Sequence, residues 1–333
     1  MEHRDNQAVQ HSRIFGIQDE ADFERVALDV FHYQAACCSV YKRYLQLLGI
    51  EPAVVKAVTE IPFLPVEMFR DAVVLADHKL AETVFRSSGT TESTTAAHHV
   101  ADLSLYRQSL LAGFVRQYGD PSGYALLALL PTYLERPDAS LVYMVKALME
   151  QSQHPLNGFF IDDLEEIHHR IVQLQKEGKR IMLIGVTFAL LDLADQYKLD
   201  LNNAVVIETG GMKGRRKEII REDLHDRLCA RFGVTTIHSE YGMTELLSQA
   251  WSSGNGRYVT PPWMRIDIGD MNDPFQRVSN GTTGVVRVID LANLYSCSFI
   301  ATQDLGKKYD DDSFEVLGRI DTSDLRGCNL MVQ

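Results

Sequence analysis

The segment Ser87-Ser88-Gly89-Thr90-Thr91, followed by Glu92-Ser93-Thr94-Thr95, gathers hydroxyl side chains around one glycine. It comes directly after residues 82–86, Glu-Thr-Val-Phe-Arg, which have the character of a β-strand. Glycine lets the backbone turn close to an anion, while hydroxyl and amide groups donate hydrogen bonds to phosphate oxygens. A Walker-type loop requires Gly-Lys-Ser/Thr. No lysine follows the glycine in this segment, so P-loop chemistry is disfavoured. Two interpretations stay open from this segment alone, a phosphate-binding loop and a Ser/Thr-rich surface loop.

The composition is that of a large globular protein. The chain has 333 residues, 45% of them hydrophobic, and a formal net charge of -12. Nucleic-acid binding relies on lysine and arginine, so a chain this acidic is not expected to bind DNA or RNA. The N-terminus is polar and no apolar run has the length of a membrane span, so we expect a cytoplasmic protein. Five cysteines without metal-binding spacing fit a reducing compartment: Cys37, Cys38, Cys229, Cys297 and Cys328.

Hydrophobic periodicity predicts an α/β protein that opens with helices. Apolar residues recur at helical spacing over residues 22–48, and the prolines of residues 61–65 then exclude a helix. After the Ser/Thr segment, helical and strand-like runs alternate, as in a sheet with helices packed on its faces. The expected helices are 103–118, 139–150, 162–177, 187–196 and 215–232, and the expected strands are 124–130, 180–184, 204–208 and 235–239.

The composition changes after about residue 246. Gly, Asn, Asp and Pro become frequent, which predicts a β-rich subdomain with strands at 284–289, 298–301 and 314–317 and a solvated hairpin tip at 307–313. We therefore expect four regions: a helical region over 1–60, an α/β core over 61–245, the β-rich subdomain over 246–318 and a tail over 319–333.

Three further segments place polar groups at expected strand ends, where α/β folds bind ligands. Residues 207–214 contain Gly210 and Gly211, and residues 238–245 contain Tyr241, Thr244 and Glu245. A threonine beside a glutamate suits a phosphate with its Mg²⁺. The third segment combines Asp304 with Arg319, a carboxylate that can accept from ribose hydroxyls and a guanidinium that can reach ribose or phosphate.

In this order, Ser-Ser-Gly-Thr-Thr, Tyr-Gly-Met-Thr-Glu, Asp-Leu-Gly and Gly-Arg-x-Asp resemble the adenylate-forming superfamily of acyl-CoA synthetases and adenylation domains. Within it, the chain resembles the acyl-protein synthetase of the bioluminescence fatty-acid reductase complex, through residues 130–136, 208–214 and 325–329. The resemblance runs from about residue 61 onward. It implies an α/β fold, the large N-terminal domain of these enzymes with a β-rich subdomain, in which the mobile C-terminal domain is missing or vestigial.

The resemblance also implies a reaction, ATP-dependent conversion of a carboxylic acid into an acyl-adenylate, with ATP and Mg²⁺ as cofactors. Thr244 would contact the α-phosphate, Glu245 would bind Mg²⁺, and Asp304 and Arg319 would bind ribose. The remaining assignments are pyrophosphate binding by Ser87, Ser88, Gly89, Thr90 and Thr91, and the adenine pocket formed by Gly210, Gly211 and Tyr241.

Two positions of the Ser/Thr segment depart from the family pattern. Glu92 stands where a glycine is usual and Thr95 where a lysine is usual. A carboxylate near a triphosphate repels it unless it points away or helps to hold Mg²⁺. His98 or His99 is a candidate for the missing positive charge, and the alternative is a histidine pair packed at the start of a helix.

Cys328 is the expected acyl acceptor, because the resemblance places the acylated cysteine near the C-terminus. Its thiolate would attack the acyl-adenylate and form a thioester for a partner such as an acyl reductase or acyl carrier. Two alternatives remain: a ligase that uses CoA or a carrier-protein thiol, as phenylacetate-CoA ligases do, and a non-catalytic module that binds nucleotide or a partner. A fatty, an aryl and a sugar-linked acid are all compatible with the sequence, and Tyr133 and Phe188 are expected to line the acid pocket.

Overall fold

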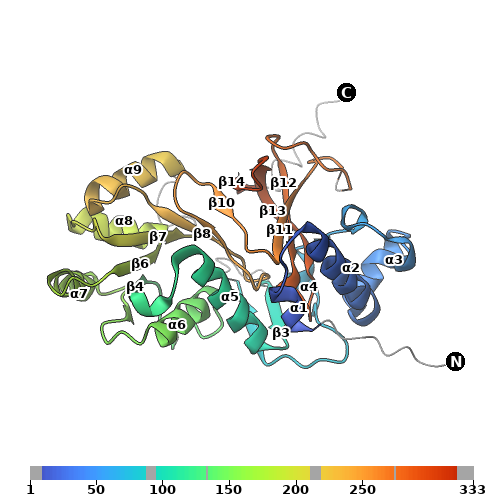
Figure 1. Ribbon diagram of the computed structural model, residues 1–333, viewed down its shortest axis with the longest axis horizontal. Coiled ribbons are helices and arrows are strands. Elements are labelled where there is room, and N and C mark those ends of the chain that lie inside the picture. Colours follow the sequence, from blue (N-terminus) through green and yellow to red (C-terminus); the bar gives the residue numbers. More distant parts are fainter. Residues whose placement is uncertain (1–9, 88–94, 133, 211–218, 274, 321–333) are drawn as a thin grey trace.

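One hydrogen-bonded sheet of 12 strands runs through the molecule (Figure 1). We describe it from a computed structural model, which covers residues 10–87, 95–132, 134–210, 219–273 and 275–320. Its strand order is β11-β12-β13-β14-β10-β9-β8-β7-β6-β4-β5, and β1 (Leu64–Pro65) pairs with β13. The sheet joins a parallel half to an antiparallel half, which confirms the predicted α/β fold with a β-rich part.

The parallel half forms because its strands are apolar on both faces. Every residue of β4 (Ala125–Leu129) and β6 (Ile181–Val186) is buried, as expected for strands covered by helices on two sides. Helices α5 (Leu103–Tyr118) and α6 (Ser140–Ser152) cover one face, and α8 (Thr187–Gln196) and α9 (Arg221–Phe232) cover the other (Figure 1). This half is completed by β5 (Gly158–Phe159), α7 (Leu164–Lys176), β7 (Ala204–Thr209) and β8 (His238–Tyr241).

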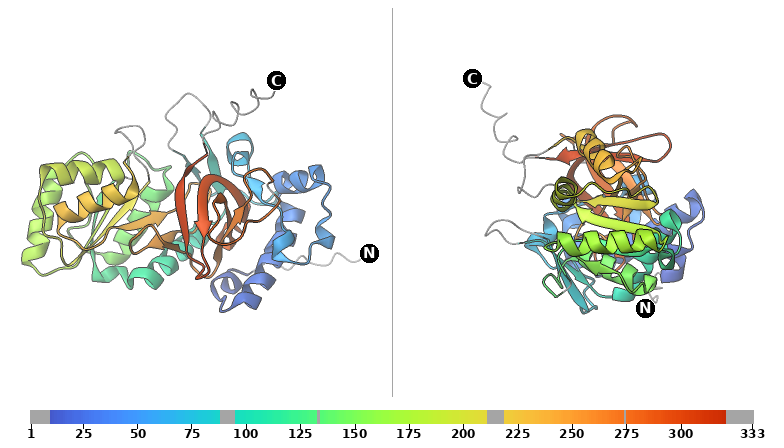
Figure 2. Two further views of the ribbon diagram at one scale, coloured as in Figure 1. Left: turned by 90° about the horizontal axis from the view of Figure 1, so that it is seen from above. Right: turned by 90° about the vertical axis from the view of Figure 1, so that its left-hand side faces the viewer.

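The antiparallel half continues the sheet from β8. Its strands are β9 (Ala250–Ser252), β10 (Tyr258–Val259), β11 (Met264–Gly269), β12 (Gly284–Asp290), β13 (Phe299–Lys308) and β14 (Phe314–Arg319). Seen from above, this half lies between the parallel half and the N-terminal helices α1 (His11–Phe15), α2 (Glu20–Cys37) and α3 (Ser39–Leu47) (Figure 2). The remaining short elements are η1 (Pro52–Val54), η2 (Val58–Glu60), α4 (Met68–Asp71), η3 (Pro121–Gly123) and η4 (Leu291–Asn293).

Gln34 of α2 fixes the N-terminal helices to the antiparallel half. Its side chain is 1% exposed, and its amide nitrogen donates to the carbonyls of Asn293 and Leu294 and to the Ser298 hydroxyl, at 2.9–3.0 Å. Its amide oxygen accepts from the Ser298 backbone at 3.0 Å. A buried amide with all these groups satisfied docks α2 in one orientation, because any displacement leaves buried polar atoms unpaired.

The strands β2 (Thr83–Arg86) and β3 (Ala97–Val100) form a separate antiparallel hairpin. The predicted strand at 82–86 is therefore confirmed, and the Ser/Thr segment connects it to a second strand. Phe85 of β2 packs on Tyr106 and Tyr143, with ring centroids 5.5 and 5.6 Å apart. The backbone N–H of Arg86 donates to Asp138 at 2.8 Å. Aromatic packing and this hydrogen bond place the hairpin beside α5 and α6.

Several predicted boundaries are confirmed and others are wrong for tertiary reasons. Helices 103–118 and 187–196 end where predicted. The helical periodicity predicted over 22–48 is confirmed as two helices, α2 and α3, which are separated at Cys38 because that residue is extended, with φ -105° and ψ 105°. The Asp77 carboxylate accepts from the N–H of Ser39 at 3.1 Å, and the Asp77 N–H donates to Cys37 at 2.6 Å. A segment distant in sequence thus caps a new helix start. Of the helix predicted over 215–232, the structure describes α9 from Arg221 onward, and residues 215–218 lie outside the described residues.

Candidate active site

The carboxyl ends of β7 and β8 form one edge of the site. The two strands are parallel, with Thr209 beside Glu240, so Gly210 and Tyr241 follow at the same level. Gly210 turns away from the strand with φ +69°, a left-handed conformation that favours glycine. The Thr187 hydroxyl donates to the Gly210 carbonyl at 2.5 Å and holds this turn in place.

Asp304 is the point at which three strands meet. The Tyr241 hydroxyl, on β8, donates to one carboxylate oxygen of Asp304 at 2.9 Å. Arg319 of β14 lies opposite Asp304 of β13 in the antiparallel pair, and its Nε is 3.5 Å from the other carboxylate oxygen. The Asp304 side chain is 14% exposed, whereas Arg319 is 68% exposed and faces solvent. The resulting cluster offers a carboxylate acceptor and a cation side by side.

The placement of Asp304 at a strand end, as predicted, is wrong. β13 extends to Lys308, and Asp304 lies within it, directly before a bulge between Leu305 and Gly306. The polar run after Ala301 resembles the end of a strand, but pairing with β14 continues the strand through it. Asp304 therefore stands on a rigid strand, and burial raises the pKa of its carboxyl while Tyr241 and Arg319 act against that shift.

Thr244 and Glu245 occupy the turn that follows β8, and two side chains from elsewhere hold this turn. His98 Nδ1 is 3.0 Å from the Thr244 carbonyl oxygen, and Asn293 Nδ2 donates to the Glu245 carbonyl at 2.7 Å. Glu245 is 6% exposed. Burial raises the pKa of its carboxyl, Arg319 lowers that pKa and the Asp304 charge raises it. These mutual effects place Glu245 in the same electrostatic environment as Asp304 and Arg319.

Behind the turn lies a buried polar network that sequence reasoning did not find. Asp290 accepts from the backbone N–H groups of Leu247 and Ser248, both at 2.9 Å, and from the Ser248 hydroxyl at 2.6 Å. Asn293 accepts from Leu247 at 3.0 Å. Asp290 and Asn293 are fully buried and lie in a region read from sequence as ordinary strand and loop. No local pattern identifies them, because their partners are about 45 residues away in sequence.

Glu240 is a further acidic residue at this edge to which the sequence assigned no role. Thr209 donates to its carboxylate at 2.6 Å. Burial raises the pKa of Glu240 to about 7, the Thr209 hydrogen bond opposes the shift, and Glu208 adds to it. At Gly242, an added Cβ would lie 2.4 Å from a carboxylate oxygen of Glu240, so a side chain there would displace that carboxylate.

Of the predicted phosphate-binding segment, Ser87 is within the described residues. Its N–H donates to the Ala96 carbonyl at 3.0 Å, and its hydroxyl accepts from the Ala96 N–H at 3.1 Å, which closes the end of the hairpin. The predicted site residues Ser88, Gly89, Thr90, Thr91, Gly211 and Cys328 lie outside the described residues.

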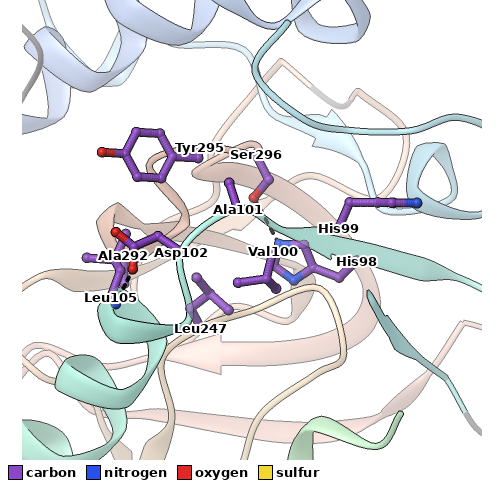
Figure 3. Close-up of a pocket in the computed structure, with 10 residues that line it drawn as sticks. All are labelled: His98, His99, Val100, Ala101, Asp102, Leu105, Leu247, Ala292, Tyr295 and Ser296. Carbon is purple, nitrogen blue, oxygen red and sulfur yellow. Dashed lines mark hydrogen bonds between the residues drawn. The ribbon is translucent and has the colours of Figure 1, made fainter. Parts of the chain in front are cut away.

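His98 does not supply the missing positive charge. It is 1% exposed on β3, and burial lowers its pKa to about 4, so the ring is neutral near pH 7. The alternative, a histidine pair at the start of a helix, is also wrong, because both histidines lie within a strand. Alternation along the strand sends His98 and His99 to opposite sides, and Figure 3 shows the two rings pointing apart.

The family model described as "Acyl-protein synthetase, LuxE" matches residues 14–333. The chain belongs to this family. No curated protein matches it. Among the described residues, no helix is long and apolar enough to cross a membrane.

Solved structures similar to this member of the acyl-protein synthetase family include 2-hydroxyisobutyryl-CoA ligase and MatB from Rhodopseudomonas palustris. An open conformation of 2-hydroxyisobutyryl-CoA ligase, in complex with 2-HIB-AMP and CoA, has a TM-score of 0.67 at 13% identity. The similar region comprises 91% of this chain and 70% of the ligase chain. ATP-bound MatB from Rhodopseudomonas palustris has a TM-score of 0.53 at 18% identity over 71% of this chain, which spans 47% of that structure. At these identities the likeness establishes the adenylate-forming ligase fold.

The neutral state of His98 predicts a pH dependence of stability. The pKa of the ring is about 4 in the folded protein and has its ordinary value of 6.5 in the unfolded chain. Between these pH values the folded state binds fewer protons than the unfolded chain, so the free energy of unfolding rises with pH. Relative to His98→Asn, which does not titrate, the wild type should gain about 2 kcal/mol of unfolding free energy between pH 5 and 7. Urea unfolding at both pH values measures the difference; an unchanged difference would mean that His98 titrates normally in the folded protein.

Proposed function

We propose that this protein activates a carboxylic acid with ATP and forms an acyl-adenylate. The observation that carries the proposal is the Asp304 cluster, in which Tyr241 and Arg319 converge on one partly buried carboxylate from separate strands. Vicinal ribose hydroxyls need an acceptor that is fixed in space, and a carboxylate on a strand, already held by a tyrosine, meets that need. Family membership supports the same chemistry, because the family is described as one of acyl-protein synthetases.

The residues of the site fit the steps of adenylation. The acid carboxylate attacks the α-phosphorus of ATP, a P–O bond forms, and the bond to pyrophosphate breaks. Asp304 would accept from the ribose hydroxyls, Arg319 would contact ribose or phosphate, and Thr244 would donate to the α-phosphate. Gly210 and Tyr241 would border the adenine ring. Since displacement at phosphorus depends mainly on positioning and charge stabilisation, a rigid arrangement of donors suffices.

Glu245 fits a Mg²⁺ ligand. Burial raises the pKa of its carboxyl and the Asp304 charge adds to that shift, so a cation at this position would stabilise the ionised carboxylate. Mg²⁺ commonly takes one or two protein carboxylates and completes its shell with phosphate oxygens and water. When bound, the ion would neutralise charge on the phosphates, while Glu245 itself would hold the metal and orient the adjoining turn.

We further propose that the acyl group passes to Cys328 as a thioester. The thiolate would attack the acyl carbon, the C–O bond to AMP would break, and AMP would leave. The family description, which names a protein as the acyl acceptor, supports a protein thiol. The resemblance to the fatty-acid reductase synthetase favours a fatty acid as substrate and a reductase or acyl carrier as partner in the cytoplasm.

Direct transfer to CoA or a carrier-protein thiol is the second candidate. One observation favours it: the ligase structure with CoA and 2-HIB-AMP resembles 91% of this chain. The two candidates share the adenylation step and differ in the atom that accepts the acyl group. Variants at Cys328 therefore separate them.

Adenylation is tested by carboxylate-dependent exchange of labelled pyrophosphate into ATP, with a panel of fatty, aryl and sugar-linked acids. Glu245→Gln should lower the exchange rate roughly 100-fold, because charge stabilisation is lost at the reacting phosphate. The matched control Glu24→Gln, an exposed position on α2, should leave the rate unchanged. EDTA should stop exchange and Mg²⁺ should restore it. Nucleotide binding without exchange for any acid would instead support a non-catalytic module.

The acceptor is tested with Cys328→Ser. Exchange should persist, whereas labelling of the protein by radioactive acid, released by hydroxylamine, should disappear. Cys229→Ser is the control, because burial and Asp226 raise the pKa of that thiol and leave it a poor nucleophile. Persistent labelling of Cys328→Ser would exclude this thiol, and stoichiometric acyl-CoA formation by the same variant would favour the CoA ligase.

A further inference from the structure

The hairpin β2–β3 has no hydrogen bonds to the strands of the main sheet, although the Ser/Thr segment joins its two strands. The turn that carries Thr244 and Glu245, in contrast, follows directly from β8 of the main sheet. Any ligand that touches both needs the hairpin and the turn at a fixed separation. A side chain that joins the two would set this separation.

His98 makes this connection. Its ring lies between the hairpin and the turn, with Nδ1 3.0 Å from the Thr244 carbonyl oxygen and Nε2 2.9 Å from the Ser296 hydroxyl. Figure 3 shows the ring directed at Ser296. Phe69 packs edge-on against the ring, with centroids 5.4 Å apart and an interplanar angle of 85°. With both nitrogens bonded and one face supported, the ring has a single orientation.

The partners of the ring also fix its tautomer. A backbone carbonyl only accepts hydrogen bonds, so Nδ1 must carry the hydrogen and donate to Thr244. In the neutral ring, Nε2 is then an acceptor, and it receives the Ser296 hydroxyl hydrogen because it lies at 2.9 Å, nearer than the Asn293 carbonyl at 3.4 Å. Each nitrogen thus has a distinct role: Nδ1 holds the turn, and Nε2 secures the ring to the segment after η4.

The turn depends on such external contacts. The carbonyls of Thr244 and Glu245 are consecutive, and side chains from β3 and η4 bind them, 146 and 48 residues away in sequence. Asn293 and Asp290 also fix the backbone on the far side of the turn, at Leu247. His98 is therefore the member of this set that ties the turn to the hairpin.

We propose that His98 is a positioning residue, which holds the β2–β3 hairpin in register with the Thr244–Glu245 turn through its Nδ1 hydrogen bond to the Thr244 carbonyl. This inference rests on the proposed adenylation and deepens it. His98 would act through the backbone of Thr244, the residue proposed to contact the α-phosphate. A shift of about 1 Å at the Thr244 hydroxyl is enough to lower the rate substantially.

The two ring nitrogens allow an isosteric test. Asparagine at 98 places its amide nitrogen where Nδ1 lies, so His98→Asn keeps the donor to Thr244 and loses Ser296. Glutamine places its amide group near Nε2, so His98→Gln keeps Ser296 and loses Thr244. Each variant loses one buried hydrogen bond, and we expect similar melting temperatures. Ser296→Ala is a further control, because it leaves the Thr244 contact intact and should behave as His98→Asn does.

In the pyrophosphate exchange assay, His98→Asn should retain kcat within about threefold, and His98→Gln should lose about tenfold or more, with KM for the acid unchanged. The Leu246 N–H donates to the Met243 carbonyl within this turn. Loss of the Nδ1 hydrogen bond should let the turn open more often, so amide hydrogen exchange at 243–247 should be faster in His98→Gln alone. Equal kcat values for the two variants, or equal exchange of the turn, would overturn the positioning role.

The second measurement separates this inference from the proposed function. Wild-type protein that exchanges no pyrophosphate with any acid would contradict adenylation, and the hydrogen-exchange comparison would still decide whether Nδ1 holds the turn. Wild-type exchange with equal activity in both variants would contradict the positioning role alone.

Discussion

The hydrogen bond between Tyr241 and Asp304 joins the two halves of the sheet at the point where the chemistry is expected. Tyr241 ends a parallel strand, whereas Asp304 lies within an antiparallel strand. The halves share one continuous sheet through β9, β10 and β14, so the separation between these residues is set by strand pairing. Arg319 reaches the same carboxylate from the next strand. The geometry of the site is therefore a property of the whole sheet.

Burial of acidic groups gives the site its electrostatic character. Burial raises the pKa values of Glu240, Glu245 and Asp304, and Arg319 is a cation that counteracts the shift at two of them. An arrangement of buried carboxylates is unfavourable unless a ligand or cation compensates it. Ribose hydroxyls and a divalent cation are compensations of the right kind, since hydroxyls donate to carboxylates and Mg²⁺ binds them. The proposed adenylation would bring both compensating groups to the site, and His98 and Asn293 hold the backbone of the Thr244–Glu245 turn beside it.

The sequence predicts the elements of this fold better than the contacts between them. The buried strands β4 and β6 are recognisable in the sequence as short apolar runs. Helices α5 and α8 show helical periodicity of apolar residues, and both end where the sequence predicts. The break at Cys38 escapes prediction because its cause is Asp77.

The same distinction holds within the site. Tyr241, Asp304 and Arg319 belong to local motifs that predict them as site residues, and the structure places the three side chains in contact. The parts played by His98 and Asn293 depend on partners far along the chain, so a single sequence carries no signal for them. The sequence offers His98 as a candidate positive charge near a phosphate, whereas burial lowers its pKa and makes the ring a neutral hydrogen-bond donor.

The central claim, attack of the acid carboxylate on the α-phosphorus of ATP, is tested most directly by isotope transfer. The acid that supports pyrophosphate exchange is labelled with oxygen-18 in both carboxylate oxygens, and the AMP released after a turnover is analysed by mass spectrometry. Adenylation predicts one labelled oxygen in AMP, because the oxygen that bridges carbon and phosphorus leaves with the phosphate. Unlabelled AMP, or label in inorganic phosphate, would contradict the account.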